Sequence, residues 1–185
     1  QEALYCAHGT NRSCRALRAT LPPRLPAKPT ASSTIRLRPI SVRNRCARTR
    51  RNVNVSMLGG VTVGPGGFMD IAANARKVVF CGTFEAKGLR VRPVDGRLVV
   101  DQPGSVPKVV AQVDQVTFSG PQAVARGQEV LYVTERAVFR LTPEGIVLAE
   151  VAPGIDVQTQ VLDRMGFAPL LPQPPAVIDG AIFRE

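Results

Sequence analysis

The sequence contains a single histidine, His8, and no run of about 18 apolar residues. Because this histidine lies in the first third of the chain, the remainder has no Ser-His-Asp triad and no credible spacing of zinc ligands. We therefore expect no metal site and no membrane span. The four cysteines do not have the spacing of a disulfide framework, which favours a reducing compartment and a cytoplasmic protein.

Acidic residues are nearly missing from residues 1–51. This segment holds 12 of the 24 Lys and Arg residues and one of the 14 Asp and Glu residues, so its formal charge is +11, whereas residues 52–185 sum to −1. It has one aromatic residue, Tyr5, and is rich in Arg, Pro, Ala, Ser and Thr. Such a segment buries too little apolar surface to offset the entropy lost on ordering, and it is expected to be disordered. The part from Asn52 onward is long enough for one core.

Three interpretations of residues 1–51 remain open. Coding DNA read out of frame from GC-rich codons yields this mixture of Arg, Pro, Ala and Ser, and composition favours this origin. An Arg-rich, acid-poor stretch is also typical of a transit peptide, although four prolines between Leu21 and Thr30 disfavour one. A nucleic-acid-binding arm is the third interpretation, but bases would find almost no aromatic residue on which to stack. Gln1 in place of an initial methionine indicates a fragment.

From Asn52 onward, short apolar runs alternate with glycine and proline, a pattern typical of an α/β or α+β domain. Asp95-Gly96 predicts a hairpin turn. The run 77–84, KVVFCGTF, is typical of a strand that is buried on both faces. Strands are expected at 53–55, 77–84, 89–93, 98–100, 109–118, 130–134, 137–141 and 146–151, with a second hairpin turn at 143–145.

Two helices are expected in this domain. The first begins at Phe68, after a glycine-rich loop at 59–67, and its inner face is formed by Phe68, Ile71, Ala72 and Ala75. The second is capped by Asp156 and closed by Gly166 at its C-terminus. Its apolar stripe is most simply explained as core packing and consists of Val157, Val161, Leu162 and Met165. Residues from Phe167 are expected to wrap the surface and to return at 177–183.

One loop has a chemical mechanism attached to it: Gly64-Pro65-Gly66-Gly67, which precedes the first expected helix. Glycines lack Cβ atoms, so their backbone can approach a ligand closely, and free N–H groups can face an anion or a developing oxyanion. Pro-Gly is also the ordinary centre of a type II turn, and the residues by themselves favour the turn.

The other reactive residue types have simpler explanations. Cys81 lies in an apolar run without an adjacent base, so it is expected to be a small core residue and not a nucleophile. Glu129, Glu135 and Arg136 lie at expected strand ends, where charges are usually solvated or paired at an edge.

Several strings of this sequence, in order, resemble the C-terminal part of the family I CoA-transferases, the acyl-CoA:acetate/3-ketoacid CoA-transferases that include bacterial acetate/propionate CoA-transferases. The resemblance covers the chain from Asn52 to its end. It implies an incomplete α/β domain of the CoA-transferase (phosphosugar-isomerase-like) type, with β-hairpins, at 52–185. The strings are NVNVS (52–56), GPGGFMDIAANARKVVFCGTF (64–84), VTFSG (116–120), RGQEVLYVTERAVFRLTPEG (126–145) and APGID (152–156).

The resemblance also implies a reaction. In that family a glutamate carboxylate attacks an acyl-CoA thioester, and a glutamyl-CoA intermediate then passes CoA to a second carboxylate. Gly64, Gly66 and Gly67 match the family's G-x-G-G loop, which implies contacts of all three with the CoA thioester and oxyanion-binding N–H groups at Gly66 and Gly67. Coenzyme A is then a substrate, and no separate cofactor is implied. The implied partners are an acyl-CoA, a short-chain carboxylate as in short-chain fatty acid or ketone body metabolism, and identical subunits of the intact enzyme; a membrane and nucleic acid are not expected.

The chain departs from the family where the nucleophile is expected. The family's glutamate lies upstream of NVNVS in an E-x-G pattern, but the only acidic residue before Asn52 is Glu2, followed by Ala3 and Leu4. The chain therefore lacks the N-terminal half that would carry the glutamate, and we expect it to be inactive alone. The alternative is a genuine small subunit whose partner chain carries the glutamate.

A trace in residues 32–36, SSTIR, favours the frameshift. These residues can be encoded by bases that, read one position earlier, spell Ile-Ile-Asp-His-Pro, and the family commonly has Ile-Ile-Asp-x-Pro at this place. The nucleotide sequence before codon 52 decides the question. If the frameshift hypothesis is right, a shifted reading frame restores family-like sequence there; if it is wrong, no frame does.

Overall fold

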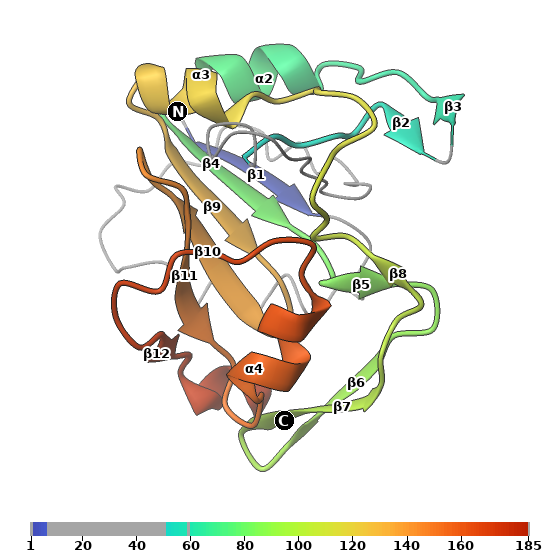
Figure 1. Cartoon of the computed structure of the whole chain (residues 1–185), viewed down its shortest axis with the longest axis vertical. Helices are drawn as coiled ribbons and strands as arrows, with labels where there is room; N and C mark the ends of the chain where they lie inside the picture. Colours follow the sequence, from blue (N-terminus) through green and yellow to red (C-terminus); the bar gives the residue numbers. More distant parts are fainter. Residues whose placement is uncertain (1, 7–50, 59, 185) are drawn as a thin grey trace.

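A computed structural model describes residues 2–6, 51–58 and 60–184 of the protein (Figure 1). Its mixture of helices and strands is the α/β class expected from the sequence. The strands are β1 (Glu2–Cys6), β2 (Met57–Leu58), β3 (Val61–Thr62), β4 (Lys77–Cys81), β5 (Glu85–Ala86), β6 (Arg90–Val94), β7 (Arg97–Gln102), β8 (Val106–Pro107), β9 (Glu129–Val133), β10 (Ala137–Leu141), β11 (Ile146–Val151) and β12 (Ala176–Val177). The helices are α2 (Phe68–Asn74), α3 (Gly120–Ala125) and α4 (Val157–Gln160), with short 3-10 helices η1 (Leu162–Arg164) and η2 (Gly180–Phe183).

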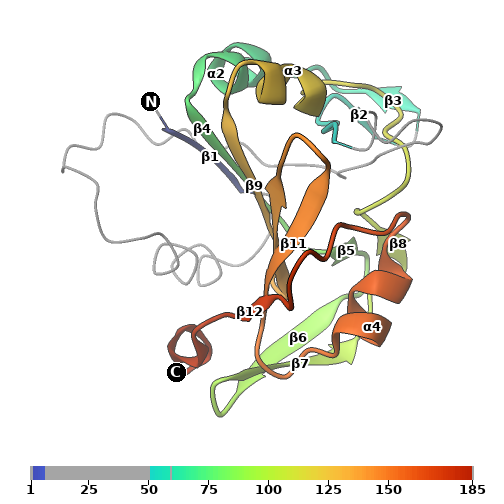
Figure 2. The same ribbon diagram turned by 60° about the vertical axis from the view of Figure 1, so that its left-hand side comes forward.

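A six-stranded mixed sheet in the order β1-β4-β9-β10-β11-β12 forms the centre of the molecule (Figures 1 and 2). β4 lies between β1 and β9 and is parallel to both, whereas β9, β10 and β11 are antiparallel neighbours. Since β4 and β9 are parallel, their carboxyl ends meet at one edge of the sheet, where the Gly82 amide donates to the Val133 carbonyl at 3.0 Å. The segments that follow these two strands therefore leave the sheet side by side.

The larger core lies on the face of the sheet that α2 and α3 cover. Its centre is an aromatic cluster in which the Phe80 ring lies 6.0 Å from the ring of Phe68, 5.0 Å from that of Phe118 and 5.5 Å from that of Tyr132. Helix α3 adds the buried side chain of Ala123. Aromatic pairs at these separations stabilise a core beyond the apolar area that they bury.

A smaller core covers the opposite face of the sheet. Val79 and Cys81 of β4 pack there with Leu98 of β7 and Ile178. The alternate residues of β4, Val78 and Phe80, belong to the larger core. β4 is thus buried on both faces, as its continuous apolar run predicts, and Cys81 is a buried core residue.

The two predicted hairpins are present. β6 and β7 are joined at Asp95 and Gly96, whose φ values are +48° and +77°. Two positive φ values are what a type I′ turn requires, and Asp-Gly adopts them at low cost. β10 and β11 turn at 143–145, where the Thr142 amide donates to the Gly145 carbonyl at 2.8 Å.

Residues 109–118 do not form the expected strand. Their backbone groups bond to separate parts of the chain: the Val109 carbonyl accepts from Gly166, and the Phe118 amide donates to Val53. Val53 itself, expected in a strand at 53–55, makes only an isolated bridge with Phe118. Burial does not follow the alternation, because Val116 is exposed and the adjacent Thr117 and Phe118 are both buried. The apolar period of two therefore does not indicate a strand here.

Helix α3 is absent from the sequence-based expectations. Ser119 caps it, with its hydroxyl accepting from the Gln122 amide at 3.4 Å, and Pro121 lies in the first turn. The dipeptide Ser-Gly followed by proline is a recognisable helix start. The helix is only six residues long, too short to show an apolar period.

The second expected helix is shorter than predicted. Asp156 caps α4 by accepting from the Thr159 amide at 2.8 Å, and hydrogen bonds from Thr159 lower the pKa of the Asp156 carboxyl. The helix ends at Gln160 and η1 follows, so Gly166 does not close it. Gly166 instead permits a close approach, because a Cβ there would lie 2.4 Å from the Ala111 amide nitrogen.

Of the segment 1–51, the structure describes only residues 2–6 and Arg51. Glu2–Cys6 pair with β4, which explains how a segment of poor composition is held: backbone hydrogen bonds of a parallel pair do not depend on side chains. Arg51 is buried, and its carbonyl accepts from the Tyr132 hydroxyl at 3.0 Å. Residues 7–50, on which the transit-peptide, nucleic-acid and frameshift interpretations depend, lie outside the described residues.

Candidate functional site

The glycine loop lies between β3 and α2 and is exposed to solvent. Gly64 and Gly66 have φ values of +72° and +54°, whereas Gly67 has a φ of −77°. The Phe68 amide donates to the Pro65 carbonyl at 3.2 Å, so Gly66 is the second position of this turn, where a positive φ is typical of a type II′ turn and not of the expected type II turn. The three glycines of the predicted site are therefore held together in one bend by their backbone conformation.

The amide groups of this bend have no backbone acceptor among the described residues. Within the described chain, the amides of Gly64, Gly66 and Gly67 donate no hydrogen bond to another backbone group, although the next amide, that of Phe68, donates to the Pro65 carbonyl. A Cβ built on Gly64 or Gly66 would meet no atom within 4 Å, and one built on Gly67 would meet only Ile71 Cδ1, at 3.8 Å. An incoming group can thus approach the backbone here without displacing a side chain.

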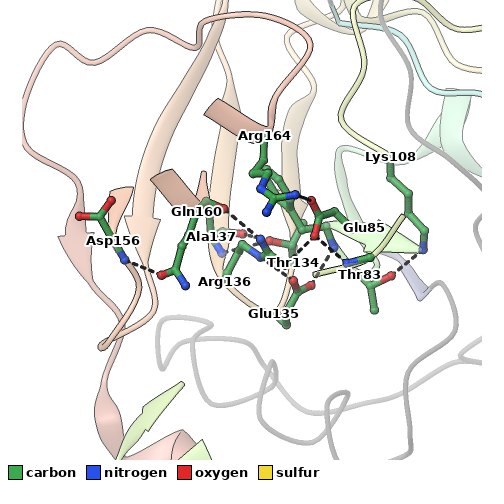
Figure 3. A network of polar contacts seen from close by, with 12 residues as sticks. Thr83, Glu85, Lys108, Thr134, Glu135, Arg136, Ala137, Asp156, Gln160 and Arg164 are labelled. Atoms are coloured by element: carbon green, nitrogen blue, oxygen red, sulfur yellow. Dashed lines mark hydrogen bonds and ion pairs between the residues drawn. The ribbon is translucent and has the colours of Figure 1, made fainter. Parts of the chain in front are cut away.

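A polar network lies at the carboxyl edge of β4 and β9 (Figure 3). Arg136 donates from Nε to Glu135 Oε1 at 2.8 Å and from Nη2 to Glu85 Oε2 at 3.3 Å, and its guanidinium lies 4.7 Å from the centre of the Phe84 ring. Arg164 reaches the other oxygen of Glu85 at 3.5 Å. Of these residues, Glu135 and Arg136 were expected as solvated or paired charges at a strand end. Their ion pair is present, but Arg136 is only 1% exposed, and Glu85, which also pairs with it, only 3%.

The network fixes the segments that leave the sheet at this edge. Glu135 Oε2 accepts from the Phe84 amide at 2.7 Å, Glu85 Oε2 accepts from the Gly104 amide at 3.0 Å, and Arg136 Nη1 donates to the Gln160 carbonyl at 2.9 Å. Both carboxylates are therefore occupied by internal donors. This arrangement suits a structural support and leaves neither glutamate placed as a nucleophile.

Lys108 borders the network and hydrogen-bonds a neutral side chain. Its Nζ donates to Thr83 Oγ1 at 2.8 Å. Burial lowers the pKa of Lys108, and attraction to Glu135 opposes that shift in part. The sequence signal for this edge was the string TER at 134–136, whose charges follow a buried strand directly.

Lys108→Met is expected to maintain or raise the stability of the fold at pH 7, because burial disfavours the ammonium group in the native state. The folded pKa lies below the unfolded one, so the native state releases its proton first and the free energy of unfolding of the wild type rises as pH increases toward the unfolded value of about 10.4. Urea denaturation between neutral pH and that value should show this rise in the wild type and a smaller one in the variant. Lys87→Met, at an exposed lysine, is the matched control.

Other site types have no support in the described residues. Residues 2–6, 51–58 and 60–184 contain no cluster of three His, Cys, Asp or Glu side chains that could hold a metal ion. In the same part of the chain, no helix has the length and apolar character needed to cross a membrane. Glu129 is an exposed strand-end charge paired with Lys77 at 3.1 Å, as expected.

The glycine bend between β3 and α2 belongs to a part of the chain whose sequence resembles the CoA-transferases. No family model matches the chain. Curated proteins do: over 132 residues, 71% of its length, the chain is 42% identical to the acetate CoA-transferase YdiF of Escherichia coli K12, and over 139 residues it is 44% identical to the caffeate CoA-transferase of Acetobacterium woodii. The chain is therefore homologous to CoA-transferases, as its motifs predict.

The solved structures agree with the sequence matches. The acyl-CoA transferase YdiF from E. coli O157:H7, determined as a thioester complex with CoA, superposes on 80% of this chain with a TM-score of 0.73 and 39% identity. The chain corresponds to only 28% of that structure and to 25–26% of the length of the curated relatives. These shares fit the prediction that it contains a part of such an enzyme.

Proposed function

We propose that this chain is a fragment of an acyl-CoA:carboxylate CoA-transferase that moves CoA between a short-chain acyl-CoA and acetate or a similar carboxylate. In this proposal, residues 52–185 form the C-terminal domain and supply the Gly66 and Gly67 amides that stabilise the oxyanion, with Gly64 shaping the bend against the CoA thioester. The observation that carries the proposal is the open bend in a chain that is 39–44% identical to CoA-transferases where it matches them.

The chemistry needs donors of this kind at each step. A glutamate carboxylate attacks the thioester carbonyl carbon, the tetrahedral oxyanion collapses to an anhydride, and the CoA thiolate leaves. The thiolate then attacks the glutamyl carbonyl and releases the acyl group as a carboxylate; the glutamyl-CoA thioester passes CoA to the second carboxylate by the same two steps in reverse. Each addition places negative charge on a former carbonyl oxygen, and backbone N–H groups that are already oriented stabilise it without reorganisation.

In this proposal the attacking glutamate comes from outside residues 52–185. Glu85 and Glu135 are held by internal donors, and Asp70 is an exposed aspartate in the first turn of α2. The relatives are about four times as long as the matched part. The nucleophile thus belongs to the polypeptide that this chain lacks, and the chain alone is proposed to be inactive.

The test is co-expression of the full chain with the three quarters of E. coli acetate CoA-transferase that it does not match. Transfer of CoA from acetyl-CoA to propionate, followed by mass spectrometry, is expected from the pair and not from either part. A purified pair without transfer would contradict the proposed activity.

Gly67→Pro examines the role of one amide in that pair. Its φ of −77° suits proline, so the substitution removes the N–H group with little change at this residue's own backbone. Losing an oxyanion donor costs about 10²- to 10³-fold in turnover, and this loss is expected in kcat. Gly67→Ala is the matched control, because it keeps the amide and its Cβ meets only Ile71, at ordinary contact distance. Equal rates for the two variants would remove Gly67 from the oxyanion site.

A further inference from the structure

Exposed apolar side chains are concentrated beside the glycine loop. Nine large apolar side chains are exposed in the described part of the chain, and four of them lie within residues 61–71. We call these four the loop-side surface: Val61, Val63, Met69 and Ile71, which are 39–62% exposed. Single exposed apolar residues need no explanation, but such a group marks a surface that another chain covers.

This surface is not part of either core. Helix α2 turns Phe68 and Ala72 inward and leaves Met69 and Ile71 outside. Val61 lies on the β2-β3 hairpin, which pairs with no other strand and projects at the end of the molecule where α2 begins (Figures 1 and 2). A two-stranded ribbon is marginally stable alone in water, so an additional contact suits it.

The loop-side surface borders the proposed oxyanion site directly. Ile71 Cδ1 lies 3.8 Å from the position of a Cβ on Gly67, and the Ile71 amide donates to the Gly67 carbonyl at 3.1 Å. Val63 immediately precedes Gly64 in the chain. A chain that brings a carboxylate to the open side of the bend must therefore also lie over these side chains.

We propose that the loop-side surface docks the part of the CoA-transferase polypeptide that this chain lacks, so that one contact both covers these apolar residues and delivers the glutamate. The inference rests on the proposed function. Its occupant follows from two facts: the matched relatives carry about three quarters of their length outside the shared region, and the bend needs a carboxylate that the described chain does not place there.

Co-purification tests the contact. The full chain, carrying an affinity tag, is co-expressed with the unmatched three quarters of E. coli acetate CoA-transferase, and the retained partner is quantified. Val61→Glu and Met69→Glu would each bury an unpaired charge in the contact and are expected to weaken retention about tenfold or more. Val177→Glu is the matched control: Val177 is 72% exposed on β12, outside the loop-side surface, and its variant should retain the partner as the wild type does.

The outcomes separate this inference from the proposed activity. Gly67→Pro is expected to retain the partner and to lose transfer, whereas Val61→Glu loses both. Retention unaffected by Val61→Glu and Met69→Glu together, with both variants folded by circular dichroism, would overturn the docking surface and leave the activity intact. Failure of the wild-type chain to retain the partner, or self-association that these variants abolish, would likewise overturn it. A retained but inactive pair would contradict the activity and not the surface.

Discussion

Arg136→Met is expected to lower the free energy of unfolding by about 3–5 kcal/mol, the usual cost of leaving one member of a buried ion pair without its partner. The Arg136 guanidinium pairs with Glu135 through Nε and Oε1, which are 2.8 Å apart. It also pairs with the buried carboxylate of Glu85. Without it, Glu85 retains the Gly104 amide and the more exposed Arg164 at 3.5 Å. Methionine fills similar volume, so the loss reports on charge more than on packing.

Urea denaturation of the full chain measures this effect. The control is Arg92→Met, which removes an exposed ion pair with Asp101 and is expected to cost about 0–1 kcal/mol. Glu85→Gln combined with Arg136→Met should recover part of the loss, because the second change removes one uncompensated charge. If Arg136→Met and Arg92→Met had equal effects, the network at the carboxyl edge would contribute nothing to the stability of the fold.

Local rules predicted the elements whose residues interact mainly with their own neighbours. Asp95-Gly96 forms a tight turn through its own backbone conformation. Asp156 caps a helix by accepting from the amide of Thr159, three residues further along the chain. The run at 77–84 is apolar on consecutive residues, so burial on both faces follows from its composition. In each case the decisive interaction spans only a few residues.

Elements decided by distant parts of the chain were not predictable in this way. Residues 109–118 alternate as a strand would, but their backbone groups find partners at Val53 and Gly166 and no ladder forms. Gly166 resembles a helix end in the sequence, and its actual role is the approach to Ala111. The spacing of residues within a segment does not predict which distant segment it will contact.

The candidate site shows the same division. The bend of Gly64 to Gly67 follows from glycines that adopt positive φ at low cost, but the turn that forms is closed by the Phe68 amide, one residue later than the Pro-Gly pair predicts. The burial of Arg136 could not be read from a charge at the end of a strand, since its contacts come from α4, β5 and the Phe84 ring. The chemistry assigned to the bend came from the resemblance of whole strings, because glycines alone do not distinguish a turn from an oxyanion site.

The break in composition at 51/52 has a structural counterpart. Arg51 is buried with Nη1 bonded to the Thr142 carbonyl, and its Nε is buried without a partner in the described chain. Its carbonyl also lies against Gly120, where a Cβ would come within 2.2 Å. A charged side chain with an unsatisfied buried nitrogen is a costly residue at this position.

Phe80→Ala is expected to cost about 3–5 kcal/mol, because the ring is fully buried and three other aromatic rings surround it. The cavity would lie between β4 and α2, so the surrounding strands cannot collapse into it without shifting Phe68 or Tyr132. Val177→Ala, on an exposed edge strand, should change stability by less than about 0.5 kcal/mol and serves as the control. The Phe80 to Phe118 contact, with its rings at 71°, should add coupling of about 0.5–1.5 kcal/mol in a double-mutant cycle by urea denaturation. If Phe80→Ala cost less than about 1 kcal/mol, as a surface substitution does, the larger core would not be closed around β4. β4 would then not be the strand that holds the domain together.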